Sequence, residues 1–177
     1  EDSDFVEHLF TATTHDYLMF FTQSGRCYVE RVFEIPEGSR ASKGRSIANL
    51  LELRNEEKIA ATIRVQAQKS DEETWSQKLH VAFSTRSGIV KKSNLSDFKN
   101  IRKGGIIAIK IEDDDRLIEC RLTNGQDEIV LITHDGMSIR FHEEEMRDQG
   151  RDTVGVWGIR PEKGDYVVAA AVVNKDA

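Results

Sequence analysis

The sequence is poor in the residues that mark disordered and disulfide-rich chains. Of its 177 residues, two are proline, 12 are glycine and two are cysteine. The low proline and glycine content argues against a disordered or collagen-like chain. Cys27 and Cys120 lack metal-type spacing, so we interpret them as free buried thiols in a reducing compartment. A chain of this length fits one domain that buries a core.

The motifs of common enzymes are also missing. The sequence has no P-loop, no nucleophile elbow and no Cys-x-x-Cys pair. The acidic run at 112–115 lacks the order and the glycine of an EF-hand loop. We therefore predict no catalytic residue, no metal site and no bound cofactor in this chain. The histidines are scattered without ligand spacing: His8, His15, His80, His134 and His142.

Signals for a membrane or for secretion are absent as well. No long apolar span and no signal peptide is visible, so we expect a soluble cytoplasmic protein. No stretch has the period of a long amphipathic helix. The chain begins with Glu1 rather than Met, and residues 4–6 resemble a run that closes later repeats. This indicates an excised part of a longer polypeptide.

What the sequence does contain is a unit that occurs three times. A Thr-x-x-Gly element stands at 22–25, 85–88 and 133–136, each time after an apolar run. Each element precedes a second run with a basic residue, then a polar loop with glycine, and finally a run opened by a carboxylate. Short β-branched runs joined by a link containing glycine predict hairpins, with Gly25, Gly88 and Gly136 at the turns.

Repeats of about 40–50 residues with about four strands are typical of propeller blades. We predict an all-β, propeller-like fold with about three blades of a larger ring. The predicted units are 4–56, 57–114 and 115–164, and 165–177 opens a further unit. Asn124-Gly125 is a strong hairpin signal before the third unit. Residues 66–78 are interpreted as a surface excursion, with Trp75 covering a hydrophobic edge.

Charge is unevenly distributed. The formal net charge is −6, yet residues 86–110 hold seven basic residues and one acidic residue. Clustered positive charge, rather than net charge, indicates a polyanionic partner. Residues 137–151 hold three basic and four acidic residues, so the third unit is the weakest candidate for phosphate contacts.

At several of these stretches the chain resembles the C-terminal domain of the DNA gyrase A subunit. The resemblance implies a β-pinwheel, whose blades exchange a strand with a neighbour, and DNA wrapped around a basic outer rim. It also implies a parent type IIA topoisomerase that uses ATP and Mg²⁺ and includes a B subunit, in the bacterial cytoplasm and nucleoid. The most specific stretches are 88–92, 100–107 and 136–141, and weaker ones include 4–10, 15–18, 34–36 and 43–45.

DNA-contacting residues are predicted from both the charge cluster and the resemblance. The loop at 99–103 beside Gly104-Gly105 suits phosphate, because lysine and arginine supply charge and glycine admits an oxyanion. Along a strand, Lys91 and Lys92 should alternate, with one side chain facing outward. The predicted DNA-binding residues are Arg40, Lys43, Arg45, Arg86, Lys91, Lys92, Lys99, Arg102, Lys103, Arg147 and Arg151.

Three functions remain open at this point. The first is sequence-independent DNA binding and wrapping that presents DNA for ATP-dependent negative supercoiling. We prefer gyrase, because the matching stretches look closer to it, over its paralogue, the topoisomerase IV C subunit. The residues that best separate the two are implied to precede residue 1. The second is a protein-interaction propeller, which a neutral apolar patch would favour over a positive stripe. The third, an enzyme with a central site, would need converging acids or a metal cluster.

Overall fold

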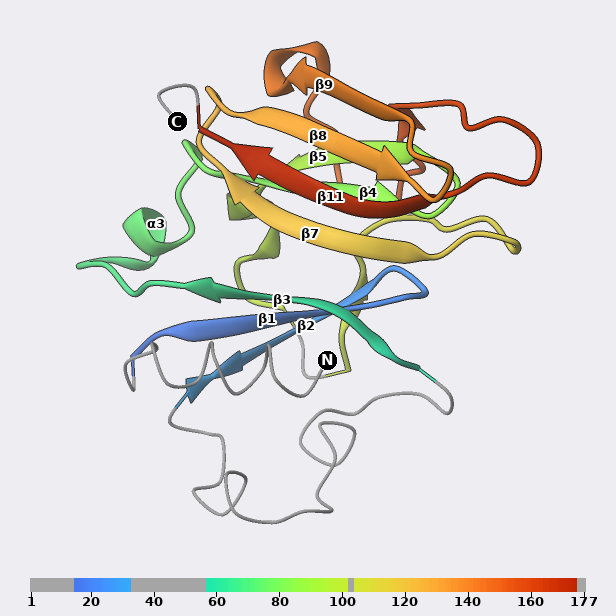
Figure 1. The fold of residues 1–177 in the computed structure, drawn as a ribbon. Coiled ribbons are helices and arrows are strands. Elements are labelled where there is room, and N and C mark those ends of the chain that lie inside the picture. The colour runs from blue at the N-terminus through green and yellow to red at the C-terminus, as the bar shows by residue number, and fades with distance from the viewer. Residues whose placement is uncertain (1–14, 33–56, 102–103, 175–177) are drawn as a thin grey trace, which may run out of the picture.

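Three antiparallel sheets make up the computed structural model, which describes residues 15–32, 57–101 and 104–174 (Figure 1). The all-β prediction is confirmed. The first sheet contains β3 (Ile59–Val65), β1 (Tyr17–Thr22), β2 (Arg26–Arg31) and β6 (Ile106–Ile107), in that order. The second contains β10 (Val156–Trp157), β5 (Ile89–Asn94), β4 (His80–Thr85) and β7 (Leu117–Thr123), and the third β11 (Val167–Val173), β8 (Glu128–Thr133) and β9 (Ser138–His142).

We call these sheets, in the order given, blades 1, 2 and 3.

Short helical turns occur at α3 (Asp71–Thr74), η3 (Leu95–Phe98) and η4 (Glu143–Glu145). Within the described ranges no helix has the length and apolar content needed to cross a membrane.

Each of the first two blades receives its last strand from the following unit. β6 comes after the second hairpin but pairs with β2 of the first, and β10 comes after the third hairpin but pairs with β5. This is the strand exchange that the resemblance implied. The boundaries predicted at 57, 115 and 165 fall just before β3, β7 and β11, and each of these strands pairs back onto the preceding hairpin.

The Thr-x-x-Gly element closes each hairpin with the same local hydrogen bonds. Each threonine hydroxyl accepts the N–H group four residues later, at 3.0, 3.1 and 3.0 Å. Each threonine carbonyl accepts the N–H group of the glycine, at 3.0–3.1 Å. The glycines have φ of 94°, 102° and 92°, a conformation that other residues rarely adopt. The prediction that Gly25, Gly88 and Gly136 are turn residues is confirmed.

The Asn124-Gly125 turn does not form a hairpin, and that prediction is wrong. Gly125 has a φ of 92°, and the turn is closed by a hydrogen bond from the Asn124 N–H group to Asp127. However, β7 before the turn belongs to blade 2 and β8 after it to blade 3. The local signal identified a tight turn correctly, but strand pairing depends on which strands the rest of the chain brings alongside.

Apolar side chains fill the spaces between blades. Between blades 1 and 2, Phe21, Phe83 and Phe98 form ring contacts with centroids 5.5–6.4 Å apart. Trp75 is 4% exposed and lies 5.2 Å from the ring of Tyr17, so its predicted covering role is confirmed. A second cluster, which includes Val90, Leu131 and Val167, joins blades 2 and 3. Cys27 and Cys120 are free and buried, as predicted.

Candidate nucleic-acid interface

The exchanged strands define the outer edge of the molecule. β7 lies against both β3 and β11, so the three blades converge along these strands (Figure 1). β6 and β10 lie at the opposite edges of their sheets. The basic loop at 99–103 leads into β6, and Arg147 and Arg151 belong to the segment that leads into β10. Two segments that are far apart in the sequence thus enter exchanged strands at corresponding edges of neighbouring blades.

Hydrogen bonds hold the second of these segments along β5. The Gln149 N–H group donates to the carbonyl of Lys92 at 2.8 Å, and the Ser93 hydroxyl donates to the Gln149 carbonyl at 2.7 Å. Arg147 and Arg151, on either side, are exposed. Their guanidinium groups are therefore carried on a chain segment whose backbone is fixed at the edge of blade 2.

Lys99 lies in the segment that leads into β6, and its side chain is already paired. Its Nζ lies 2.9 Å from Glu72 Oε1, and this hydrogen bond raises the pKa of Lys99 and lowers that of Glu72. Both side chains remain open to solvent, so a phosphate could replace the carboxylate. Its predicted neighbours Arg102 and Lys103, and the loop with Arg40, Lys43 and Arg45, lie outside the described residues.

Lys91 is buried rather than presented to a ligand. The residue is 1% exposed, its Nζ donates to the carbonyl of Ala108 at 2.5 Å, and it lies 5.5 Å from the ring of Phe83. Desolvation lowers its pKa to about 8, while Asp152 and Asp97 act in the opposite direction. Lys91 thus joins blade 2 to the strand segment that blade 1 receives.

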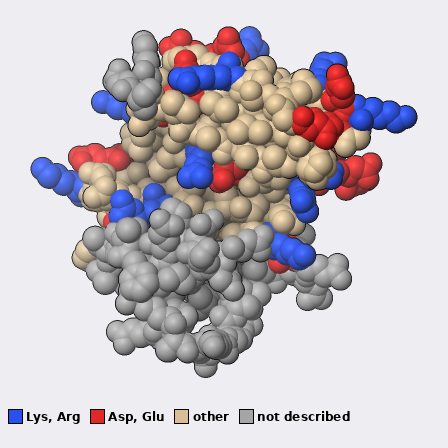
Figure 2. Space-filling view, in the orientation of Figure 1, with Lys and Arg blue, Asp and Glu red and all other residues tan. Residues whose placement is uncertain are grey.

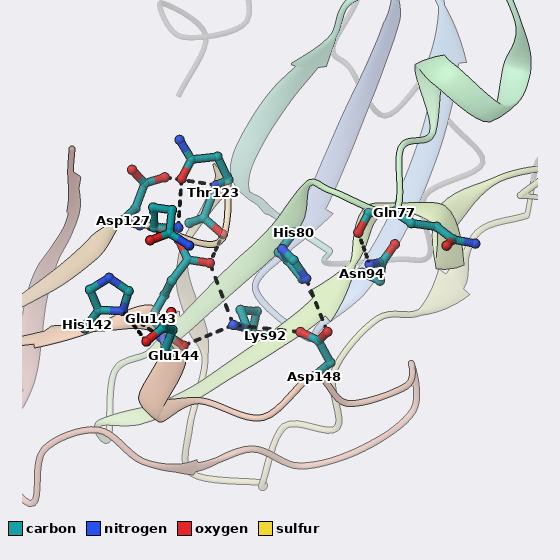
Figure 3. Close-up of polar contacts among 12 residues, drawn as sticks. Gln77, His80, Lys92, Asn94, Thr123, Asp127, His142, Glu143, Glu144 and Asp148 are labelled. Atoms are coloured by element: carbon teal, nitrogen blue, oxygen red, sulfur yellow. Dashed lines mark hydrogen bonds and ion pairs between the residues drawn. The ribbon is translucent and has the colours of Figure 1, made fainter. Parts of the chain in front are cut away.

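Lys92 is buried on the other side of β5, facing blade 3 (Figure 3). Its Nζ donates to the Glu143 carbonyl at 3.0 Å and lies 3.7 Å from the Glu143 carboxylate. That carboxylate is fully buried and accepts from the Thr123 hydroxyl and the Asp127 N–H group, both at 2.9 Å. A strand between two neighbouring blades has both faces covered. The prediction of one outward-facing lysine is therefore wrong, and we leave Lys91 and Lys92 out of the interface.

Arg86 lies in the β4–β5 turn, at a strand end rather than along the outer edge. Its guanidinium carbon stands 4.0 Å from the centre of the Tyr166 ring, which stacks on His134 at 5.0 Å. His134 Nδ1 is 3.0 Å from Asp135, whose N–H group donates to Asp165. In blade 2 the corresponding residues, Ser87 and Asp115, make the same turn contact. We therefore assign this group of side chains to the architecture of the turn.

Two cations along the outer edge were absent from the predicted contact residues. Lys110 is exposed, 3.9 Å from Asp152, and Arg160 is exposed with its guanidinium 5.4 Å from the ring of Trp157. Lys110 was counted in the basic cluster at 86–110, a signal that could have identified it. Arg160 lies outside that cluster and is recognisable only once β10 is seen at the edge.

The face of blade 3 over β8 and β11 differs from the outer edges. Figure 2 shows a broad area there with few charged side chains, and charged groups gather around its margin. Ile132 is 42% exposed and Val168 48% exposed on these strands. The structure thus contains an apolar patch, which favours a protein partner, as well as the exposed cations of the outer edge.

Known proteins have sequences and a fold that are similar to those of this chain. The chain is 43% identical over 176 residues to the DNA gyrase A subunit of Staphylococcus epidermidis, covering 99% of this chain and 19% of that protein. It is 42% identical over 158 residues to the DNA gyrase A subunit of Clostridium acetobutylicum, covering 89% of this chain and 18% of that protein. The chain therefore spans about a fifth of the length of these relatives.

Solved structures of topoisomerase and gyrase C-terminal domains are also similar to this chain. The C-terminal domain of a DNA topoisomerase IV superposes with a TM-score of 0.79 at 29% identity, over 92% of this chain and 48% of that one. The C-terminal domain of a DNA gyrase A has a TM-score of 0.70 at 24% identity, over 91% and 49%, which supports the fold. The family described as DNA gyrase C-terminal domain, beta-propeller, matches residues 16–66, 80–124 and 127–174, and the chain belongs to this family.

Proposed function

We propose that this chain binds duplex DNA through its outer edge, as a sequence-independent wrapping module of a type IIA topoisomerase. The observation that supports the proposal is that the segments leading into β6 and β10 lie at corresponding edges of blades 1 and 2, with Arg147 and Arg151 exposed on the second of them. DNA that follows the outer edge would meet the exposed cations of these segments in succession. Contacts spread along an arc are what bending stiff DNA requires, because its persistence length is about 150 bp.

The chemistry suits phosphate rather than bases. Arginine and lysine at a backbone-fixed edge offer charge and hydrogen-bond donors to phosphate oxygens, which position DNA without reading its sequence. We expect strand cleavage, the ATP and Mg²⁺ of the parent enzyme, and the contact with a B subunit to involve other parts of the protein. The relatives at 40–43% identity are A subunits of DNA gyrase, which favours gyrase over topoisomerase IV.

A salt titration with matched variants tests the proposal. Arg151→Ala should flatten the slope of log K against log salt by about 0.9, and the double change Arg147→Ala/Arg151→Ala should flatten it by about 1.8. The reason is that fewer counterions leave the DNA on binding when a phosphate contact is lost. Arg121→Ala removes the same charge from an exposed position on β7, where the blades converge, and should leave the slope unchanged. Equal effects of Arg151→Ala and Arg121→Ala would show that the outer edge is not the DNA site.

The uncharged face of blade 3 supports a second candidate, a protein contact. Ile132 and Val168 are exposed there, although apolar side chains fill the spaces between the other blades. Ile132→Glu should weaken any such contact by placing a charge in it. Sedimentation of the unchanged chain and of Ile132→Glu measures protein association, and DNA affinity is measured in the same samples. A loss of association with unchanged DNA affinity would separate this role from DNA binding.

A further inference from the structure

The outer edge carries apolar side chains as well as cations. Trp157 on β10 is 49% exposed and Ile107 on β6 is 42% exposed. Trp157 pairs with Ile89, the first residue of β5, and Ile107 pairs with Arg26, the first residue of β2. The two exposed side chains therefore occupy the same position on the exchanged strands of consecutive blades.

The backbone holds both positions rigidly. The two residues that follow Ile107 donate their N–H groups to the carbonyl of Gly25, at 2.8 and 3.2 Å. The two that follow Trp157 donate to the carbonyl of Gly88 in the same way, at 2.8 and 3.3 Å. Strand pairing precedes each exposed residue and these paired hydrogen bonds follow it. The backbone that carries each side chain therefore does not have to be ordered when a partner binds.

The surroundings of Trp157 indicate the chemistry of the partner. The guanidinium carbon of Arg160 stands 5.4 Å from the ring centre, and Arg147 and Arg151 are exposed on the segment that leads into β10. An exposed apolar ring beside the guanidinium of Arg160, on an edge that also carries Arg147 and Arg151, suits a partner that alternates anionic and apolar groups. The phosphate–deoxyribose backbone of DNA has this alternation, and its sugars are the same for every sequence.

We propose that Trp157 and Ile107 pack against deoxyribose on successive segments of bound duplex DNA, giving each blade a salt-independent contact beside its phosphate contacts. The inference rests on the proposed DNA-binding function and extends it to two apolar residues. Insertion between base pairs is the less suitable geometry. An apolar wedge kinks the duplex toward its major groove and opens the side that it enters, so a wedge from the protein side would bend DNA away from the edge.

Tryptophan fluorescence tests the contact directly, because the chain contains only Trp75 and Trp157. Trp75 is 4% exposed, so Trp75→Phe leaves Trp157 as the single reporter and Trp157→Phe leaves the buried one. Adding a mixed-sequence DNA duplex should reduce acrylamide quenching of Trp157 and leave that of Trp75 unchanged. Anisotropy of the labelled duplex, measured in the same samples, reports whether DNA is bound.

Matched substitutions test the energetics. Ile107 and Ile132 are both 42% exposed, but only Ile107 lies on the outer edge. Ile107→Ala should lower DNA affinity about threefold and Trp157→Ala about tenfold, by the same factor at every salt concentration. Ile132→Ala should have no effect, and Trp157→Phe should retain most of the affinity. Circular dichroism of each variant checks that it is folded.

The possible results separate the two proposals. No change in duplex anisotropy at any salt concentration would contradict DNA binding itself. DNA binding with unchanged quenching of Trp157, and with Ile107→Ala equal to Ile132→Ala, would overturn the sugar contact and leave the phosphate contacts standing. Protection of Trp157 that grows with protein concentration in the absence of DNA would assign this edge to self-association and would also overturn the inference.

Discussion

At the scale of single residues, β5 is unusual in burying two consecutive lysines. Lys91 donates to a carbonyl on the side of blade 1, and Lys92 contacts Glu143 on the side of blade 3. Buried charges are expensive unless they are paired or hydrogen-bonded, and both lysines satisfy this condition with groups at the boundary to a neighbouring blade. We infer that this pair of lysines secures blade 2 between its neighbours.

The lowered pKa of Lys91 predicts a pH-dependent contribution to stability. Its pKa is about 8 in the folded protein against 10.5 as the ordinary value, so between these values the unfolded chain binds more protons. Folding stability should therefore rise with pH across this window, by at most about 3 kcal/mol from this group. Chemical denaturation of the wild type and of Lys91→Met between pH 7 and pH 10.5 measures the effect. A constant difference between the two proteins would contradict it.

The Lys92–Glu143 pair should show strong energetic coupling. Leu95 is the residue of blade 2 that corresponds to Glu143 of blade 3, and both are fully buried. A charged side chain at this position is therefore a particular feature of the contact between blades 2 and 3. A double-mutant cycle with Lys92→Met and Glu143→Gln should give a coupling of about 1–3 kcal/mol, because each single change leaves an unpaired buried group.

An exposed ion pair provides the control for this cycle. Arg121 and Glu119 lie 3.4 Å apart with side chains 58% and 26% exposed. Their coupling should stay below about 1 kcal/mol, as is usual at a surface. A similar coupling for both pairs would argue against a special role for the buried one.

At the scale of elements, the hairpin turn also joins neighbouring units. The carbonyl of Gly25 accepts two N–H groups from the segment after β6, and that of Gly88 accepts two from the segment after β10. A Cβ atom built on Gly88 would stand 2.1 Å from the carbonyl oxygen of Ile159, whereas one on Gly136 would meet no atom within 4 Å. In blade 2 the Thr-x-x-Gly turn therefore closes a hairpin and contacts the next unit, whereas in the described part of blade 3 it closes a hairpin only.

This difference predicts unequal effects of the same substitution. Gly136→Ala should destabilise the protein by about 1–2 kcal/mol, because alanine is strained at positive φ. Gly88→Ala adds a backbone clash to the same strain and should cost at least about 3 kcal/mol. Urea unfolding of both variants measures the difference, and equal losses would show that the contact between units adds little.

At the scale of the whole molecule, a net charge of −6 coexists with cations placed along the outer edge. The net charge repels a polyanion at long range, so DNA affinity must come from short-range contacts at that edge. The two solved C-terminal domains described above are about twice its length, since it covers 48–49% of each. Its arc of contacts is correspondingly short.

We accordingly expect this chain, taken alone, to bind DNA weakly and to wrap it poorly. The dissociation constant should be roughly 10⁻⁴–10⁻⁶ M at physiological salt, the range of non-specific binding. The linking number of a nicked circle that is religated in its presence should not change, because too few contacts offset the energy of bending. Tight binding with a clear topological shift would show that the described edge suffices for wrapping.

The sequence alone determined the local structure of this protein. The Thr-x-x-Gly turn is closed by hydrogen bonds within five residues, so its three copies predicted three hairpins and the glycine at each turn. The repeat itself predicted an all-β, propeller-like fold. The turn prediction holds because each turn is formed by residues that are close together in the chain, and the fold prediction holds because the same local pattern occurs three times.

Only the tertiary structure decided which strands share a sheet and which side chains meet solvent. β6 and β10 pair with hairpins of the preceding unit, and the Asn124-Gly125 turn crosses between blades. The same packing buries Lys91 and Lys92 and leaves Ile107 and Trp157 exposed. Burial depends on contacts between residues distant in sequence. A strand of alternating side chains therefore cannot reveal by itself whether one of its faces or both of them will be covered.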